Sequence, residues 1–134
     1  MSPERSFIVL TPESETGHDG ILQPPEIVGL NLNVDLVFLS ACETGIGKTY
    51  PGEGSLNMAR PFLIAGSNST IVTNWAIDDR FTAEFVRSYY EFLTEGYSKS
   101  LSLTMTQRAM IESEVALYND PYFWAPFFLI GLAD

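Results

Sequence analysis

The chain's one cysteine, Cys42, lies where an apolar segment gives way to a loop that contains glycine. The apolar segment is Val34–Ser40, and Gly45 and Gly47 follow the cysteine. A thiol becomes a strong nucleophile as its thiolate, which near neutral pH needs a base or a positive environment. Backbone amides of a glycine-permitted turn, here Cys42 to Gly45, can stabilise a developing oxyanion. The pattern therefore indicates acyl transfer with Cys42 as the nucleophile.

Two other interpretations of this loop stay open. A free cysteine is commonly a small buried apolar residue. The segment Gly45–Thr49 ends like a phosphate-binding loop, but that motif requires glycine where Cys42 stands. It also requires a helix immediately afterwards, whereas Tyr50-Pro51-Gly52 follows here. The nucleotide-binding interpretation is the weakest of the three.

The segments around the loop follow the pattern of an α/β protein. Apolar runs predict strands over residues 6–10, 34–40, 70–75 and 127–130. Cap, proline and glycine signals predict helices over residues 24–29, 54–65, 78–96 and 98–117. Strands that alternate with helices favour a mainly parallel sheet flanked by helices. Ligands bind beyond the carboxyl ends of such strands, and Cys42 follows one of these ends.

Two of the predicted helices have apolar stripes at helical spacing, which indicate their buried faces. The stripes are Phe81, Phe85, Tyr89 and Phe92 in one helix, and Leu101, Met105 and Ala109 in the next. Asp78 precedes the first of these helices and is predicted to cap it. Trp75 and the cluster Tyr122–Trp124 fit either a packed core or the lining of a substrate groove.

Composition limits the class of protein. The 134 residues suit one domain, 1–134, and 46% hydrophobic with 18% charged residues is a globular composition. The net charge of −10 argues against nucleic-acid binding, which needs clustered Lys and Arg. With one His and one Cys, the sequence predicts neither an internal disulfide nor a metal site, and no cofactor is expected.

The location is expected to be cytoplasmic. The first residues lack the charged-then-apolar pattern of a signal peptide. No apolar run approaches the roughly 20 residues that span a bilayer, so no membrane interaction is expected.

Three segments together resemble the CHAT family, caspase-like domains that are often attached to tetratricopeptide repeats. The resemblance extends from about Ser6 to Gly131, and its segments are DLVFLSACETGIGK, GEGSLNMARPFLIAGSNSTIVTNWAIDDRFTAEFVRSYYEFLTEG and DPYFWAPFFLIG. Membership in this caspase–separase clan implies a caspase-like α/β fold and cysteine peptidase chemistry. It also implies that Cys42 is the nucleophile.

The catalytic histidine is where the sequence departs from the family. The family uses a Cys–His dyad, and in caspase-like sequences the histidine lies about 50 residues before the cysteine. Only 41 residues precede Cys42, so the resemblance implies a partial domain that lacks the N-terminal strands and the catalytic-His segment. His18 is the alternative base, although a histidine in a polar loop is usually just solvated. The chain alone is therefore expected to be a very poor peptidase.

Three further residues are candidates for substrate binding. Asp79 resembles an aspartate with which separases bind a basic side chain, and otherwise it is a helix N-terminal charge. Glu43 is either a second contact for a basic substrate or a solvated loop charge. Ser40 stands two residues before Cys42, a position that lines the specificity pocket in related families.

The sequence thus predicts the nucleophile-bearing part of a caspase-like cysteine endopeptidase that acts on proteins or peptides. The alternative is a non-catalytic module for assembly or protein binding. The expected partners are an upstream segment or an attached repeat domain. An uncovered sheet edge also favours pairing with a second copy of the chain.

Overall fold

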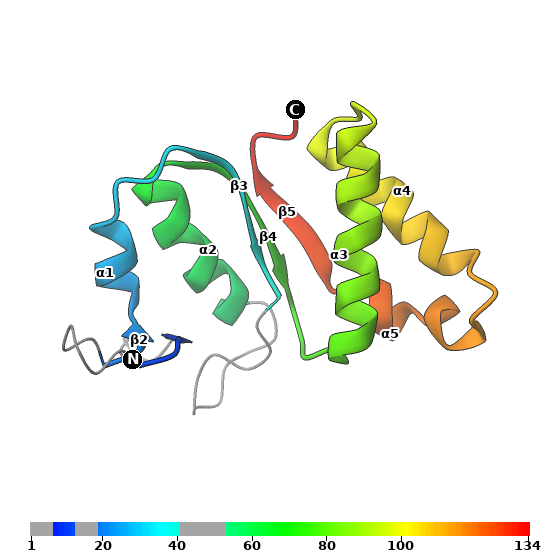
Figure 1. The fold of residues 1–134 in the computed structure, drawn as a ribbon, viewed down its shortest axis with the longest axis horizontal. Helices are drawn as coiled ribbons and strands as arrows, with labels where there is room; N and C mark the ends of the chain where they lie inside the picture. Colours follow the sequence, from blue (N-terminus) through cyan, green and yellow to red (C-terminus); the bar gives the residue numbers. More distant parts are fainter. Residues whose placement is uncertain (1–6, 13–18, 41–52) are drawn as a thin grey trace.

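The computed structural model describes residues 7–12, 19–40 and 53–134. A three-stranded sheet stands between two layers of helices, as Figure 1 shows. The strands lie in the order β3 (Val34–Leu39), β4 (Ser67–Thr73) and β5 (Phe127–Gly131). The predicted α/β class is confirmed.

The pairing of the strands brings two carboxyl ends to one edge of the sheet. Strand β3 is parallel to β4, with Val34 opposite Ser67 and Leu39 opposite Val72. Strand β5 is antiparallel to β4, and its first residue, Phe127, lies opposite Thr73 at the end of β4. Within the described residues the sheet thus has one parallel and one antiparallel pair of strands. The pair is antiparallel because β5 begins beside the carboxyl end of β4.

A smaller layer covers one face of β3. The hairpin of β1 (Ile8–Val9) and β2 (Ile21–Leu22) precedes α1 (Pro24–Val28). Buried side chains of α1 and of α2 (Glu53–Ala65) form a core cluster of Ile27, Met58 and Phe62. Half-buried residues of the hairpin, of β3 and of the segment before β3 pack against this cluster: Ile8, Leu22, Leu32, Val37 and Leu39. The strand predicted over 6–10 is present at Ile8–Val9, and the predicted helix at 24–29 is confirmed.

Gly66 ends α2, as its position predicted. Its φ is +114°, a conformation that side-chain-bearing residues rarely adopt. A Cβ atom at this position would also collide with the Leu32 carbonyl. Gly66 therefore permits the tight connection from α2 into β4.

Helix α3 (Asp79–Thr94) contributes three of the eight buried residues of a second core cluster. The eight are Phe81, Phe85 and Tyr89 of α3 with Ile71, Ile77, Leu103, Met110 and Phe127. Phe81, Phe85 and Tyr89 are buried and Phe92 is half-buried, which confirms the predicted stripe. The ring of Phe85 stacks on Phe127 of β5, with centroids 3.8 Å apart. Burial raises the pKa of Tyr89 to about 12, so the phenol is neutral at physiological pH.

The prediction for α4 (Lys99–Ile111) was wrong in two respects. The expected stripe does not mark the buried face: Leu101 is 45% exposed, and the buried residues are Lys99, Ser102, Leu103, Thr106 and Met110. The helix also ends six residues before the predicted Leu117. The side-chain amide of Asn119 donates hydrogen bonds to the carbonyls of Met110, Ile111 and Ser113, which closes this end before the short helix η1 (Ala116–Asn119).

A buried ammonium group joins two segments that lie 64 residues apart in the sequence. Lys99 is only 3% exposed, and its Nζ donates to Asp35 Oδ1 at 2.8 Å. The side-chain amide of Asn68 donates to the same oxygen at 3.0 Å. These two hydrogen bonds, with that of Lys99 the stronger, hold the pKa of Asp35 below its ordinary value of 3.8. The pair thereby fastens α4 to the start of β3.

Replacing Asp35 with Asn is expected to destabilise the fold in a pH-dependent way. Because folding lowers the pKa of this carboxyl, its charge stabilises the native state above the unfolded pKa, and this contribution is lost as the pH falls through the folded pKa. Urea unfolding should give a lower free energy of unfolding for Asp35→Asn than for the parent at pH 7. The two free energies should converge below pH 3.8. The control Glu84→Gln removes a half-exposed carboxylate whose partner, Arg87, is itself exposed, so its loss of unfolding free energy at pH 7 should be smaller. If the difference in unfolding free energy between the parent and Asp35→Asn stayed constant from pH 7 to below pH 3.8, the lowered pKa of Asp35 would be contradicted.

Candidate active site

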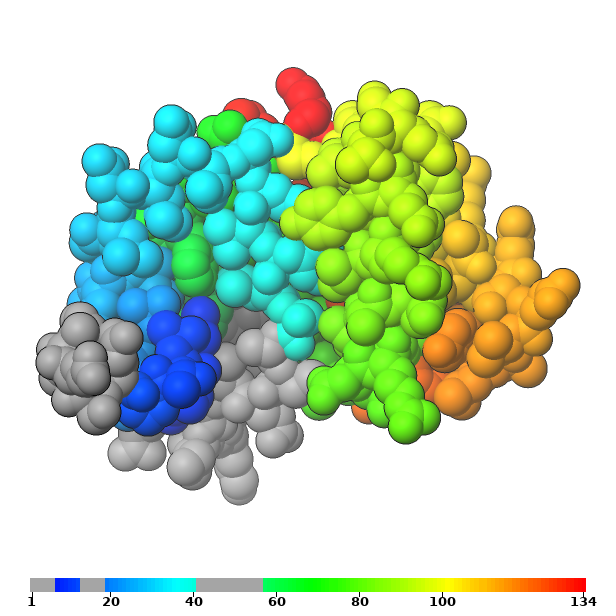
Figure 2. All heavy atoms as spheres, viewed as in Figure 1, coloured from blue at the N-terminus to red at the C-terminus, as the bar shows by residue number. Residues whose placement is uncertain are grey.

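Two of the candidate site residues, Ser40 and Asp79, lie in the part of the chain that the structure describes. Ser40 follows the last residue of β3 and is exposed at the carboxyl edge of the sheet. Cys42, Glu43, Gly45 and His18 lie outside the described residues, so their predicted roles stay predictions. Strand β3 forms one border of the sheet, and Figure 2 shows its cyan residues at the molecular surface beside α3.

The segment after β4 is held in place by α5 (Pro121–Trp124). The indole Nε1 of Trp75 donates to the carbonyl of Tyr122 at 2.8 Å, and the Tyr122 hydroxyl donates back to the Ala76 carbonyl at 2.9 Å. The amide of Asn74 donates to the Pro126 carbonyl at 3.1 Å. These three bonds fix the path of the chain between β4 and α3. The role of Tyr122 as an anchor for this segment is a feature that sequence reasoning missed.

Two adjacent aspartates at the start of α3 differ in what their side chains do. Asp78 Oδ1 accepts hydrogen bonds from the amides of Arg80 at 2.9 Å and Phe81 at 3.2 Å, so Asp78 is the predicted N-cap. The carboxylate of Asp79 is exposed and has no hydrogen bond or ion pair within the described part of the chain. Asp79 is therefore available to a ligand, whereas one oxygen of Asp78 is engaged by its own helix.

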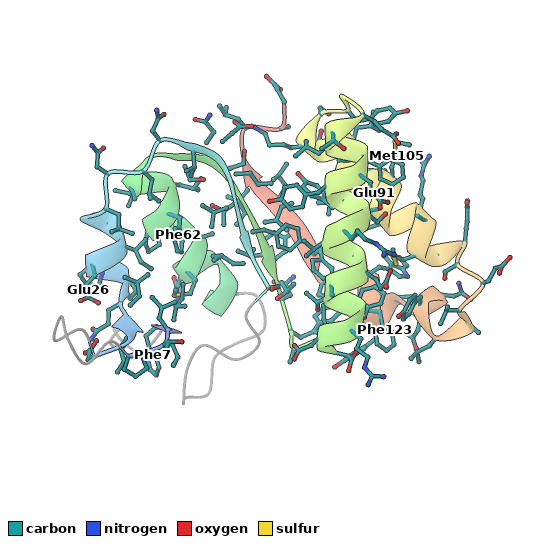
Figure 3. The ribbon with its side chains drawn as sticks, viewed as in Figure 1. Phe7, Glu26, Phe62, Glu91, Met105 and Phe123 are labelled. Carbon is teal, nitrogen blue, oxygen red and sulfur yellow. The ribbon has the colours of Figure 1, made fainter. Side chains whose placement is uncertain are left out.

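The aromatic residues near this edge divide between surface and core. Trp75 and Tyr122 are 40% and 52% exposed, and their rings lie 6.1 Å apart. Phe123 and Trp124 are half-buried and pack against the core between the sheet and α3. Figure 3 shows Phe123 beside the first turns of α3. Phe123 and Trp124 therefore belong to the core, whereas Trp75 and Tyr122 are surface residues and their place in a substrate groove stays a prediction.

Residues 7–12, 19–40 and 53–134 form neither a membrane-spanning helix nor a cluster of metal-binding side chains. None of the helices in these ranges is long and apolar enough to cross a bilayer. The same residues contain no group of three or more His, Cys, Asp or Glu side chains placed to hold a metal ion.

Comparison with known proteins gives consistent matches. The CHAT domain matches residues 1–132 of the chain. Tetratricopeptide repeat protein 28 of Mus musculus is 30% identical over 111 residues, and the protein of the same name from Homo sapiens is 27% identical over 111 residues. Each match covers 83% of this chain and 4% of the relative, so the chain corresponds to a small part of these proteins.

Proposed function

The chain belongs to the CHAT domain family, and we propose that it is the nucleophile-bearing part of a caspase-like cysteine endopeptidase. The main support is the course of β3, which ends at the carboxyl edge with Ser40 exposed. Cys42 follows Ser40 by two residues. In open α/β sheets this edge is where ligands bind. The family match and the strand geometry therefore favour the same location for the chemistry.

The proposed reaction is acyl transfer through a thioester. The Cys42 sulfur attacks the scissile carbonyl while a histidine accepts the thiol proton, and backbone amides of the Cys42–Gly45 loop stabilise the oxyanion. The C–N bond then breaks, the amine leaves with the proton returned by the imidazolium, and water hydrolyses the thioester. We propose that this histidine comes from a segment upstream of Met1.

The proposed substrates carry a basic side chain before the cleaved bond. The support is Asp79, whose carboxylate is exposed and has no partner within the described residues. An unpaired carboxylate beside the catalytic edge complements Lys or Arg through charge-assisted hydrogen bonds. We place Ser40 and Glu43 in the lining of the same specificity pocket.

Asp79→Asn is expected to lower kcat/KM for basic substrates by about 10–100-fold. This range corresponds to the loss of one hydrogen bond to a charged group. Fluorogenic peptides with Arg, Asp or Ala before the scissile bond measure this in a polypeptide that includes the upstream segment. Rates for the Ala peptide should change little. Glu95→Gln, which removes one exposed carboxylate at the opposite end of α3, is the matched control. An equal loss for all three peptides would refute the specificity role of Asp79.

The alternative function is a non-catalytic module for assembly. Two observations favour it: the relatives are named for tetratricopeptide repeats, and β3 has a neighbour on one side only within the described sheet. Such an edge can pair with a second copy, and we propose an attached repeat domain as a further partner. Absence of Cys42-dependent cleavage in the longer polypeptide would decide for this alternative.

A further inference from the structure

A hollow of about 610 Å³ opens between the start of α3, η1 and α5. Its apolar floor consists of Phe81, Tyr118 and Phe123. The Phe81 ring lies edge-on to Tyr118 at 4.9 Å and tilted against Phe123 at 5.2 Å, and Phe81 is 1% exposed. A floor of mutually packed rings is preorganised, and the volume falls within the roughly 300–1,000 Å³ of ligand pockets.

The rim of this hollow exposes apolar side chains. Val115 and Leu117 line it, and they are 50% and 60% exposed. Figure 2 shows the two contributing segments, the green start of α3 and the orange residues near η1, meeting at the surface. Clustered exposed apolar side chains around a hollow are typical of a docking surface.

The charges around the hollow define the partner that fits it. Asp78 lines it, and Asp79, Glu114 and Asp120 lie within two residues of the lining in the sequence. All four are exposed, and the lining contains one cation, Arg80. The surplus of negative charge attracts a basic partner and repels an acidic one.

Aromatic rings connect the hollow to the candidate active site. The Trp75 ring lies 6.1 Å from Tyr122, and the Tyr122 ring lies 5.4 Å from Phe123 in the floor. Because Trp75 follows β4 by two residues, this row of rings extends from the carboxyl edge to the hollow. An extended peptide can therefore contact both places.

We propose that the hollow is a docking site for a peptide segment with a bulky apolar side chain flanked by Lys or Arg. The apolar side chain enters between Leu117 and the aromatic floor, and the flanking cations lie against the rim carboxylates. The lining contains none of the candidate catalytic residues, although the rim carboxylate of Asp79 is shared with the proposed specificity pocket, and binding in the hollow needs no cleavage. It provides a second contact through which a partner or substrate is selected.

Titration of the ¹⁵N-labelled chain carrying Cys42→Ala tests the proposal. The probes are the acetylated, amidated pentapeptides Gly-Lys-Phe-Lys-Gly, Gly-Glu-Phe-Glu-Gly and Gly-Lys-Gly-Lys-Gly, up to millimolar concentration. The first should shift the resonances of Val115, Leu117 and Phe123. It should bind at least about tenfold more tightly than the other two, because only it matches both the apolar floor and the rim charge.

Leu117→Lys should weaken binding of the first peptide at least about fivefold by placing a charge in the apolar entrance. Leu101→Lys, at an exposed site on α4 outside the hollow, should leave binding unchanged. If Leu117→Lys loses the native NMR spectrum, Val115→Lys is used in its place as the test variant. Three results would overturn the proposal. They are equal affinity for the acidic peptide, resonance shifts at residues outside the hollow, and burial of the rim by self-association in the absence of peptide.

Discussion

Peptide cleavage by the 134-residue chain alone is expected to be about 10²–10⁴-fold slower than by a longer CHAT polypeptide that brings a histidine to Cys42. This range is what a positioned general base contributes to catalysis. Without it, a thiol is only a few per cent ionised at pH 7. The measurement is kcat/KM for one basic fluorogenic peptide, compared between the two polypeptides at equal concentration.

The single thiol makes the cause of a slow rate measurable. Alkylation of Cys42 by iodoacetamide should follow the ionisation of an ordinary thiol in the chain alone, with a midpoint near pH 8.5, and should shift to lower pH in the longer polypeptide. Cys42→Ala should remove cleavage in both, and His18→Ala should change neither. Turnover by the chain alone that depends on both Cys42 and His18 would refute an upstream base and identify His18 in its place.

The sequence predicted those helices whose ends or buried faces depend on residues close by in the chain. The proline-to-glycine segment of α1, the Asp78 cap and the apolar stripe of α3 all have the form that the sequence indicates. Each depends on interactions within about one helical turn or on one continuous face. The side of α3 that carries Phe81 and Phe85 was therefore predictable without any tertiary contact.

Contacts between distant residues set the features that could not be predicted. Helix α4 buries Lys99 because Asp35, 64 residues away, accepts its hydrogen bond. Its apolar residues lie on more than one face, so their spacing does not identify the buried one. Likewise, Trp75 is held at the surface by Tyr122, 47 residues away. The sequence could single out Ser40 and Asp79 as candidate specificity residues, a role that stays a prediction, but it could not indicate the hollow beside α5.

The antiparallel direction of β5 links the fold to both proposed sites. Because β5 begins opposite the last residue of β4, the preceding helix α5 must lie at the carboxyl edge. This placement brings Tyr122 to the segment after β4 and Phe123 to the first turn of α3. If the last strand were instead parallel to β4, it would begin at the amino end of β4. The helix before it would then lie at that end of the sheet, where neither contact could form. The direction of β5 therefore assembles the aromatic row that extends from the carboxyl edge of the sheet.

Phe85→Ala is expected to lower the free energy of unfolding by about 3–5 kcal/mol, the largest stability change that we predict. Phe85 is fully buried, and its ring stacks on Phe127 at 3.8 Å, which joins α3 to β5. Removal of the ring leaves a cavity between these elements that packed neighbours fill only partly. Since small domains have total stabilities of about 5–15 kcal/mol, the variant should approach the limit of folding.

Urea denaturation of the parent, Phe85→Ala and Phe92→Ala provides the comparison. Phe92 lies on the same helix but is half-buried, so its truncation should cost only about 1 kcal/mol. Phe85→Leu keeps most of the volume and should fall between the parent and Phe85→Ala. Equal losses at Phe85 and Phe92 would show that the Phe85–Phe127 stack does not hold α3 against the sheet. The aromatic contacts at the start of α3 would then need another source of rigidity.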